Sequence, residues 1–198
     1  MSITHVRDAE GGRSLGEHLT SVDEFALDLE AAGFHRYSDR LCLVQVSTRE
    51  RTYVADPLSF EVRDVLAEAV EDPDTRTVMH GADFDIRLLD RDLDLRIQGL
   101  FDTQAAASLL GENALGLSSL LEKHLDVQLS KKHQKADWAR RPLPDEMLEY
   151  AADDTRHLLE LADLLRDRLE SAGRVDWARS ECRSLESIRY EEPEDEDP

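Results

Sequence analysis

The sequence lacks the features of a membrane or secreted protein. No apolar run approaches the roughly 20 residues that cross a bilayer. The first twelve residues, MSITHVRDAEGG, have neither the basic start nor the hydrophobic stretch of a secretory signal. Only two cysteines occur, Cys42 and Cys182, and neither has the spacing of a zinc or redox motif. We therefore expect a cytoplasmic protein whose thiols are reduced and structural.

Positive charge is also scarce. The 198 residues include 24 Lys and Arg against 44 Asp and Glu, which gives a net charge of −20. Six of the acids lie in the last eight residues, EEPEDEDP, which we interpret as a disordered tail. Residues 1–190 still carry a net charge of −14. Because such a surface repels the phosphates of nucleic acid, a nucleic-acid function would require a local basic patch.

Hydrophobic patterning predicts one α/β domain over residues 1–189, followed by the acidic tail 190–198. Its order of strands and helices predicts a mixed β-sheet flanked by helices. The expected strands lie near residue 5 and at 24–29, 40–47, 51–57, 75–80 and 99–101. The expected helices lie at 58–71, 83–92, QAAASLLG after a cap at Asp102 and Thr103, LSSLLEKHL, 144–173 and 174–189, with a polar loop at 127–143.

Two acids interrupt the apolar run FALDLE. Alternate side chains of a strand share a face, so Asp28 and Glu30 would lie side by side. Like charges in a partly buried place repel each other and lose hydration. Such a pair persists if a cation binds between the carboxylates, which makes FALDLE a candidate half of a metal site.

Two further segments could supply the other half. In EYAADDTRHL, Tyr150 and Asp154 are four residues apart and therefore share one helical face. In HGADFDIRLL, Asp85 lies near the expected start of a helix. In a chain with 44 acids, each of these signals alone is weak.

Together and in this order, the segments resemble the DEDD superfamily of 3′→5′ exonucleases, in the subclass with tyrosine in its third motif. The likeness is strongest to ribonuclease D and to the exosome exonuclease, and it covers about residues 2–172. Position 149 holds glutamate, so the histidine subclass does not fit. The segments in family order are FALDLE, RLCLVQVS, HGADFDIRLL, FDTQAAASLL, LSSLLEKHL, KKHQKADWARRPLP and EMLEYAADDTRHLL.

The resemblance implies a ribonuclease H-like fold and a site that uses two divalent ions, Mg²⁺ or Mn²⁺. The implied metal ligands are Asp28, Glu30, Asp85 and Asp154, and the implied catalytic residues are these four acids and Tyr150. Asp28 would bridge the ions, Glu30 and Asp154 would complete the ion that activates water, and Asp85 would hold the second ion. Since the ordinary pKa of tyrosine is about 10, Tyr150 would orient the water rather than act as a base.

The implied activity is removal of nucleoside 5′-monophosphates from the 3′ ends of single-stranded RNA. Two alternatives remain open from the sequence: a 3′→5′ DNA exonuclease of the same superfamily, and a catalytically silent nucleic-acid-binding adaptor. One more helix and an acidic tail follow the region of resemblance, where full-length ribonuclease D has helical RNA-binding domains. A preference for tRNA precursors is therefore not implied.

A basic loop could provide the local patch that the net charge demands. Five of the chain's few cations fall within eleven residues, and we predict that they bind substrate phosphates, with a solvated loop as the alternative. These cations are Lys131, Lys132, Lys135, Arg140 and Arg141. Trp138, in the same loop, is expected to anchor it in the core rather than to stack on a base. His80 is expected to be structural, because hard cations prefer oxygen ligands.

Overall fold

A mixed β-sheet forms the centre of the protein, whose computed structural model describes residues 3–32, 40–130, 132–133 and 136–192. In this part of the chain six strands lie in the order β1-β4-β3-β2-β5-β6. They are β1 (Ile3–Val6), β2 (Glu24–Ala31), β3 (Leu41–Ser47), β4 (Thr52–Ala55), β5 (Arg76–Met79) and β6 (Leu100–Asp102). β3 is antiparallel to both β2 and β4, whereas the other neighbouring pairs are parallel.

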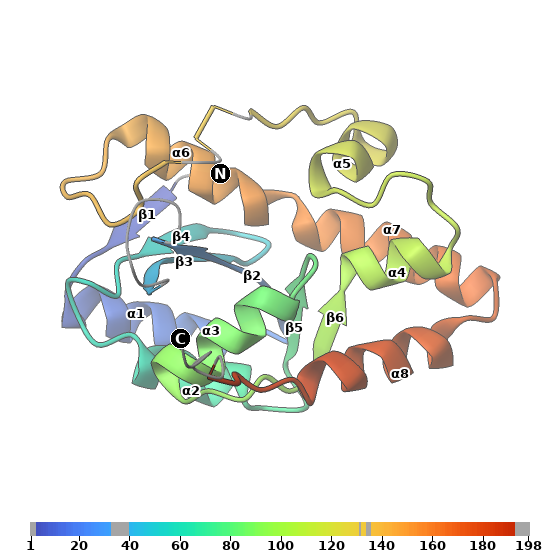
Figure 1. Ribbon diagram of the computed structural model, residues 1–198, viewed down its shortest axis with the longest axis horizontal. Helices are drawn as coiled ribbons and strands as arrows, with labels where there is room; N and C mark the ends of the chain where they lie inside the picture. Colours follow the sequence, from blue (N-terminus) through green and yellow to red (C-terminus); the bar gives the residue numbers. More distant parts are fainter. Residues whose placement is uncertain (1–2, 33–39, 131, 134–135, 193–198) are drawn as a thin grey trace, which may run out of the picture.

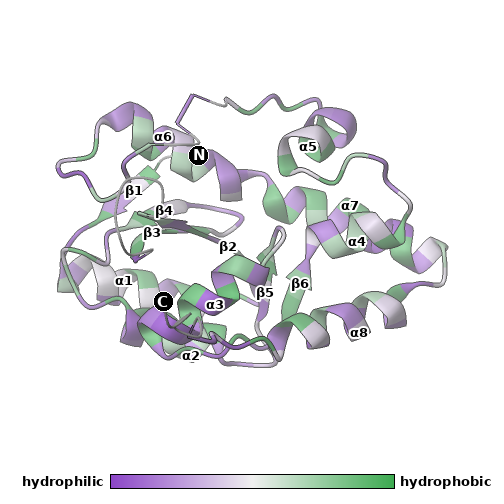
Figure 2. Ribbon diagram, in the orientation of Figure 1, coloured by the Kyte–Doolittle hydropathy of each residue, from purple (hydrophilic) through white to green (hydrophobic). Residues whose placement is uncertain are grey.

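Helices cover both faces of the sheet (Figure 1). They are α1 (Ala9–Leu19), α2 (Arg63–Val70), α3 (Asp83–Leu93), α4 (Thr103–Leu109), α5 (Leu117–Leu125), α6 (Asp145–Arg156), α7 (Leu158–Ser171) and α8 (Val175–Glu186). In the view of Figure 1, α4 to α7 lie above the sheet, and α1, α2, α3 and α8 lie below it. Figure 2 shows the helices banded in green and purple, as expected for helices with one side on the core and one in solvent. The predicted α/β fold with a mixed, helix-flanked sheet is confirmed.

The two faces of β2 differ as its sequence predicts. Phe25, Leu27 and Leu29 are buried in the core that β2 shares with the helices below the sheet. Asp28 and Glu30 alternate with them and so point to the opposite face, which α6 covers. The strand thus presents both carboxylates to α6 while its apolar side chains hold it in the core.

Three helix predictions need correction. Residues 9–19 form α1, for which no helix was predicted, and the helix expected at 58–71 begins only at Arg63. The single helix expected at 144–173 is two helices, because the backbone of His157 leaves the helical region with φ −110° and ψ 4°. Of the predicted acidic tail, residues 193–198 lie outside the described residues.

Candidate active site

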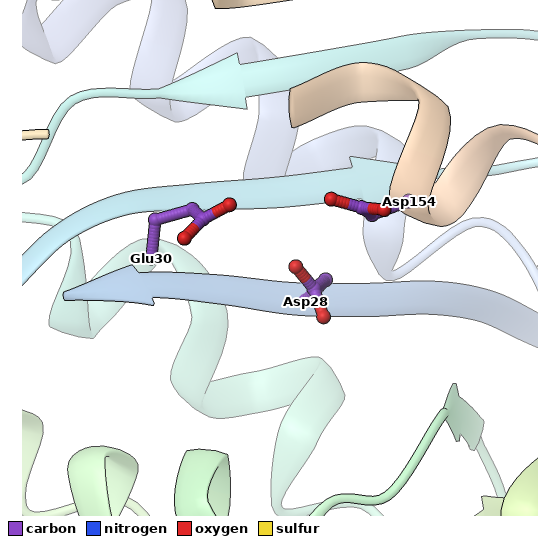
Figure 3. Close-up of side chains that lie close together, drawn as sticks. All are labelled: Asp28, Glu30 and Asp154. Carbon is purple, nitrogen blue, oxygen red and sulfur yellow. The ribbon is translucent and has the colours of Figure 1, made fainter. Parts of the chain in front are cut away.

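Three carboxylates converge above the end of β2. Asp28 and Glu30 project from β2, and Asp154 reaches toward them from α6 (Figure 3). One carboxylate oxygen from each of the three lies within 4.8 Å of the other two. All three residues are half-buried. The structure therefore brings together the two acids of FALDLE and the acid of the EYAADDTRHL segment, as predicted.

Small side chains let α6 approach the sheet closely. Ala151 and Ala152 are fully buried where α6 packs on β2, β3 and β4. Beside Asp154, the hydroxyl of Thr155 is 2.8 Å from the hydroxyl of Ser47 on β3. This contact fixes the rotation of α6 about its axis, and so it directs Asp154 toward β2.

Asp85 approaches the same carboxylates from the first turn of α3. Its exposed fraction is 8%. The turn is held by Asp102, whose Oδ2 accepts a hydrogen bond of 2.7 Å from the backbone N–H of Ala82. The other oxygen of Asp102 accepts from Ala105 N at 2.8 Å, which confirms the predicted cap of α4. The bond to Ala82 was not predicted, because it depends on β5 and β6 being neighbours in space, which no local pattern reveals.

Burial raises the pKa of every acid in this group, and neighbouring carboxylates add to each shift. Burial, and then the carboxylates of Asp85 and Asp154, raise the pKa of Asp28 well above its ordinary range. Burial and Asp154 raise the pKa of Glu30 to about 9. Burial is likewise the main cause that raises the pKa of Asp85 to about 8 and that of Asp154 to about 7. A cation placed among these oxygens would relieve the repulsion between the carboxylates and favour their charged forms.

Tyr150 sits beside the acids and is held by two aromatic neighbours. Its ring stacks on that of Trp138, with centroids 6.0 Å apart, and meets the ring of His133 edge-on at 5.7 Å. Burial and the charge of Asp154 raise the pKa of Tyr150 to about 12. The phenol therefore keeps its proton at neutral pH and can donate or accept a hydrogen bond, but it cannot serve as a base. Trp138 is 2% exposed, which confirms its predicted role as a core anchor.

The basic loop is only partly described. Lys131 and Lys135 lie outside the described residues. The ammonium group of Lys132 is exposed and pairs with Glu146 at 2.6 Å, and Arg140 is exposed. Whether these cations bind phosphate stays a prediction.

Arg141 differs from the other cations of the basic loop, because its guanidinium group is hydrogen-bonded inside the protein. Its Nε and Nη2 donate to the carboxylate of Asp56 at 2.6 and 2.7 Å. Its remaining N–H groups bond to the backbone oxygens of Cys42, Trp138 and Arg140. Because all five donors of the guanidinium are used inside the protein, we revise the role of Arg141 from phosphate binding to anchoring the loop.

The donor set fits hard divalent cations. All converging ligand atoms are carboxylate oxygens, which Mg²⁺ and Mn²⁺ prefer. His80 is not in the cluster and instead has its Nδ1 2.9 Å from the hydroxyl of Thr103, in agreement with the predicted structural role. Cys42 and Cys182 are free and buried, also as predicted. No helix in the described part of the chain is long and apolar enough to span a membrane.

Comparison with known proteins identifies the family. Residues 3–170 match the family described as 3′-5′ exonuclease, and the chain belongs to this family. It is 40% identical over 179 residues to the exosome complex exonuclease RRP6 of Saccharomyces cerevisiae, which covers 90% of this chain and 24% of that protein. The chain thus spans about a quarter of this relative.

Solved structures agree in fold. The catalytic core of RRP6 from Trypanosoma brucei superposes with a TM-score of 0.91 at 36% identity, over 97% of this chain and 54% of that one. Escherichia coli RNase D, described as an exoribonuclease, gives 0.88 at 28% identity, over 94% of this chain and 50% of that one. Brucella melitensis NrnC with bound Mg²⁺ gives 0.78 at 28% identity, over 94% of this chain and 91% of that one. The predicted resemblance to ribonuclease D and the exosome exonuclease is confirmed.

Proposed function

We propose that this chain is a metal-dependent 3′→5′ exoribonuclease that removes nucleoside 5′-monophosphates from single-stranded RNA 3′ ends. The convergence of Asp28, Glu30 and Asp154 within 4.8 Å, with Asp85 beside Asp28, carries the proposal. Membership in the 3′-5′ exonuclease family supports the reaction, and the likeness to RRP6 and RNase D supports RNA as the substrate.

In the proposed reaction water attacks the phosphorus of the last phosphodiester, and the bond from phosphorus to the 3′ oxygen of the preceding nucleotide breaks. The phosphate leaves with the terminal nucleotide, and the shortened chain gains a 3′ hydroxyl. Two divalent cations would supply an activated water and stabilise the leaving oxygen.

The protein's own groups hold and orient these components. Glu30 and Asp154 would bind one cation together with Asp28, and Asp28 would also contact the second. Asp85 lies outside the group of three mutually close oxygens, which suits a ligand of the second cation. Tyr150 would hydrogen-bond the attacking water and hold it in line with the scissile bond.

The test is a time course on 5′-labelled RNA and DNA of one sequence with Mg²⁺, Mn²⁺ or EDTA, alongside Asp28→Ala. We expect a metal-dependent ladder that shortens from the 3′ end, is faster on RNA and is lost in the variant. A faster ladder on DNA would favour a DNA exonuclease. Absence of cleavage in either metal, from a folded sample, would favour a silent adaptor. We also propose that the protein is cytoplasmic, which its two free thiols support.

A further inference from the structure

Gln45 is a polar residue in the middle of the core. It lies in β3, its exposed fraction is 0%, and neither Oε1 nor Nε2 has a hydrogen-bond partner among the residues that the structure describes. Buried polar groups are nearly always paired, since an unpaired amide loses its hydration without compensation. Such an amide in a folded protein therefore calls for an explanation.

The register of the sheet places Gln45 beside the metal-binding acids. Gln45 is the direct cross-strand partner of Asp28, so the two side chains share one face with Cβ atoms roughly 5 Å apart. Ser47, two residues further along β3, points to the same face and contacts Thr155 of α6. Figure 3 shows β3 running alongside β2 at Asp28, with α6 above both. Gln45 is thus enclosed between the sheet and the helix that carries Asp154.

Three hydroxyl groups on this face are hydrogen-bonded to one another. The hydroxyl of Ser47 is 2.9 Å from that of Thr52 on β4 and 2.8 Å from that of Thr155. Ser47 thus links Thr52 of β4 to Thr155 of α6. Gln45 lies beside Ser47 along β3 and opposite Asp28 on β2. Both polar atoms of its amide are unpaired among the described residues, and so is Nε2 of His5, two strands away on the same face.

We propose that Gln45 is a positioning residue of the metal site, whose amide N–H donates to the carboxylate of Asp28 when divalent cations are bound. This inference rests on the proposed function, since it assigns Asp28 to the cations. A carboxylate that contacts cations keeps lone pairs for a further donor. Such a donor fixes the direction of the ligand and strengthens metal binding.

The experiment compares wild type with Gln45→Leu, using Mn²⁺ alone as the probe, in calorimetric titration and in thermal unfolding with EDTA. Leucine has a similar volume and no polar atoms, so the metal-free variant should unfold at the same temperature as wild type or higher. Its Mn²⁺ affinity should fall about 10-fold to 100-fold. Turnover on RNA should recover as Mn²⁺ is raised. If Gln45→Leu does not fold, Gln45→Met replaces it in the experiment, because methionine keeps the length of the side chain.

Thr52→Val is the matched control, because it removes a hydroxyl from the same polar layer one strand farther from Asp28. It should lower the metal-free unfolding temperature and leave Mn²⁺ affinity unchanged. If wild type binds Mn²⁺ and cleaves RNA but Gln45→Leu binds Mn²⁺ equally well, Gln45 is structural and this inference alone is wrong. If wild type binds no Mn²⁺, the proposed function is wrong together with it.

Discussion

At the scale of single residues, the site is a group of carboxylates whose repulsion opposes folding. Burial raises the pKa of Asp85 to about 8, and burial and Asp154 raise that of Glu30 to about 9. Groups with such shifts destabilise the protein unless a cation compensates for their charge. The arrangement therefore lowers the stability of the metal-free chain and favours the binding of cations.

Asp85→Asn should stabilise the metal-free protein and remove part of its pH dependence. The pKa of Asp85 is about 8 in the folded protein and near its ordinary value of 3.8 after unfolding, so the folded state binds more protons between these values. The free energy of unfolding of wild type should thus fall as pH rises from about 4 to about 8. At pH about 8 the variant should gain at least about 1 kcal/mol, since one pKa unit corresponds to about 1.4 kcal/mol.

Chemical denaturation in EDTA at several pH values measures this effect. Asp83→Asn is the control in the same helical turn, because Asp83 is exposed and pairs with Arg87 at 3.0 Å. It should change stability by less than about 0.5 kcal/mol, without the same trend in pH. Excess Mg²⁺ should reverse the order of Asp85→Asn and wild type, because only a complete site gains stability by binding. A metal-free Asp85→Asn that is less stable than wild type at pH about 8 would contradict the prediction.

At the scale of elements, the sequence predicts the strands and most helices because their apolar periodicity is local. The sequence of α1 does not predict a helix, because glycines at 11, 12 and 16 reduce helix propensity. The helix forms because it packs on α2. Glycine is needed at position 12 for close packing, since a Cβ there would lie 2.7 Å from the ring of Phe60. The break between α6 and α7 at His157 keeps apolar side chains in helical periodicity on both sides, so no pattern reveals it.

In the site, too, local patterns can be predicted from the sequence and contacts between distant segments cannot. The three acidic segments could be predicted, because each has a local signature and their order resembles a known family. Gln45 and the second hydrogen bond of Asp102 could not, because their roles depend on which strands are neighbours. The charge of Arg141 alone predicts a role in the basic loop, whereas its partner Asp56 is 85 residues away in the sequence.

Gly99→Ala should disrupt the entry to β6. Gly99 has φ +67°, and a Cβ there would lie 2.5 Å from the backbone oxygen of Thr75. The substitution combines backbone strain with a clash that no side-chain rotation relieves, so we expect a loss of about 2–4 kcal/mol in unfolding free energy. Gly111→Ala is the control, since Gly111 has φ +78° with nothing within 4 Å. It should cost only about 1–2 kcal/mol. Equal losses in urea denaturation would show that the contact with Thr75 is unimportant.

At the scale of the whole molecule, the net charge of −20 opposes the proposed substrate. The Debye length is about 30 Å at 0.01 M salt and about 8 Å at 0.15 M. At low salt, RNA is therefore repelled by most of the protein surface, whereas at higher salt it interacts mainly with groups close to the binding site. The cations of the basic loop and the metal ions can then dominate.

The KM for single-stranded RNA should consequently pass through a minimum as NaCl is raised at constant Mg²⁺. Between about 0.01 M and 0.1 M, screening of the repulsion should lower KM. Above that range, loss of the local phosphate contacts should raise it, as for other proteins that bind nucleic acid. A chain ending at Glu192 lacks four acids of the tail. It keeps the hydrogen bond from the backbone N–H of Tyr190 to the carboxylate of Asp90. It should show a lower KM than the full chain at the lowest salt and the same KM at about 0.15 M. A KM that rises steadily from the lowest salt would mean that local contacts outweigh the net charge even when screening is weak.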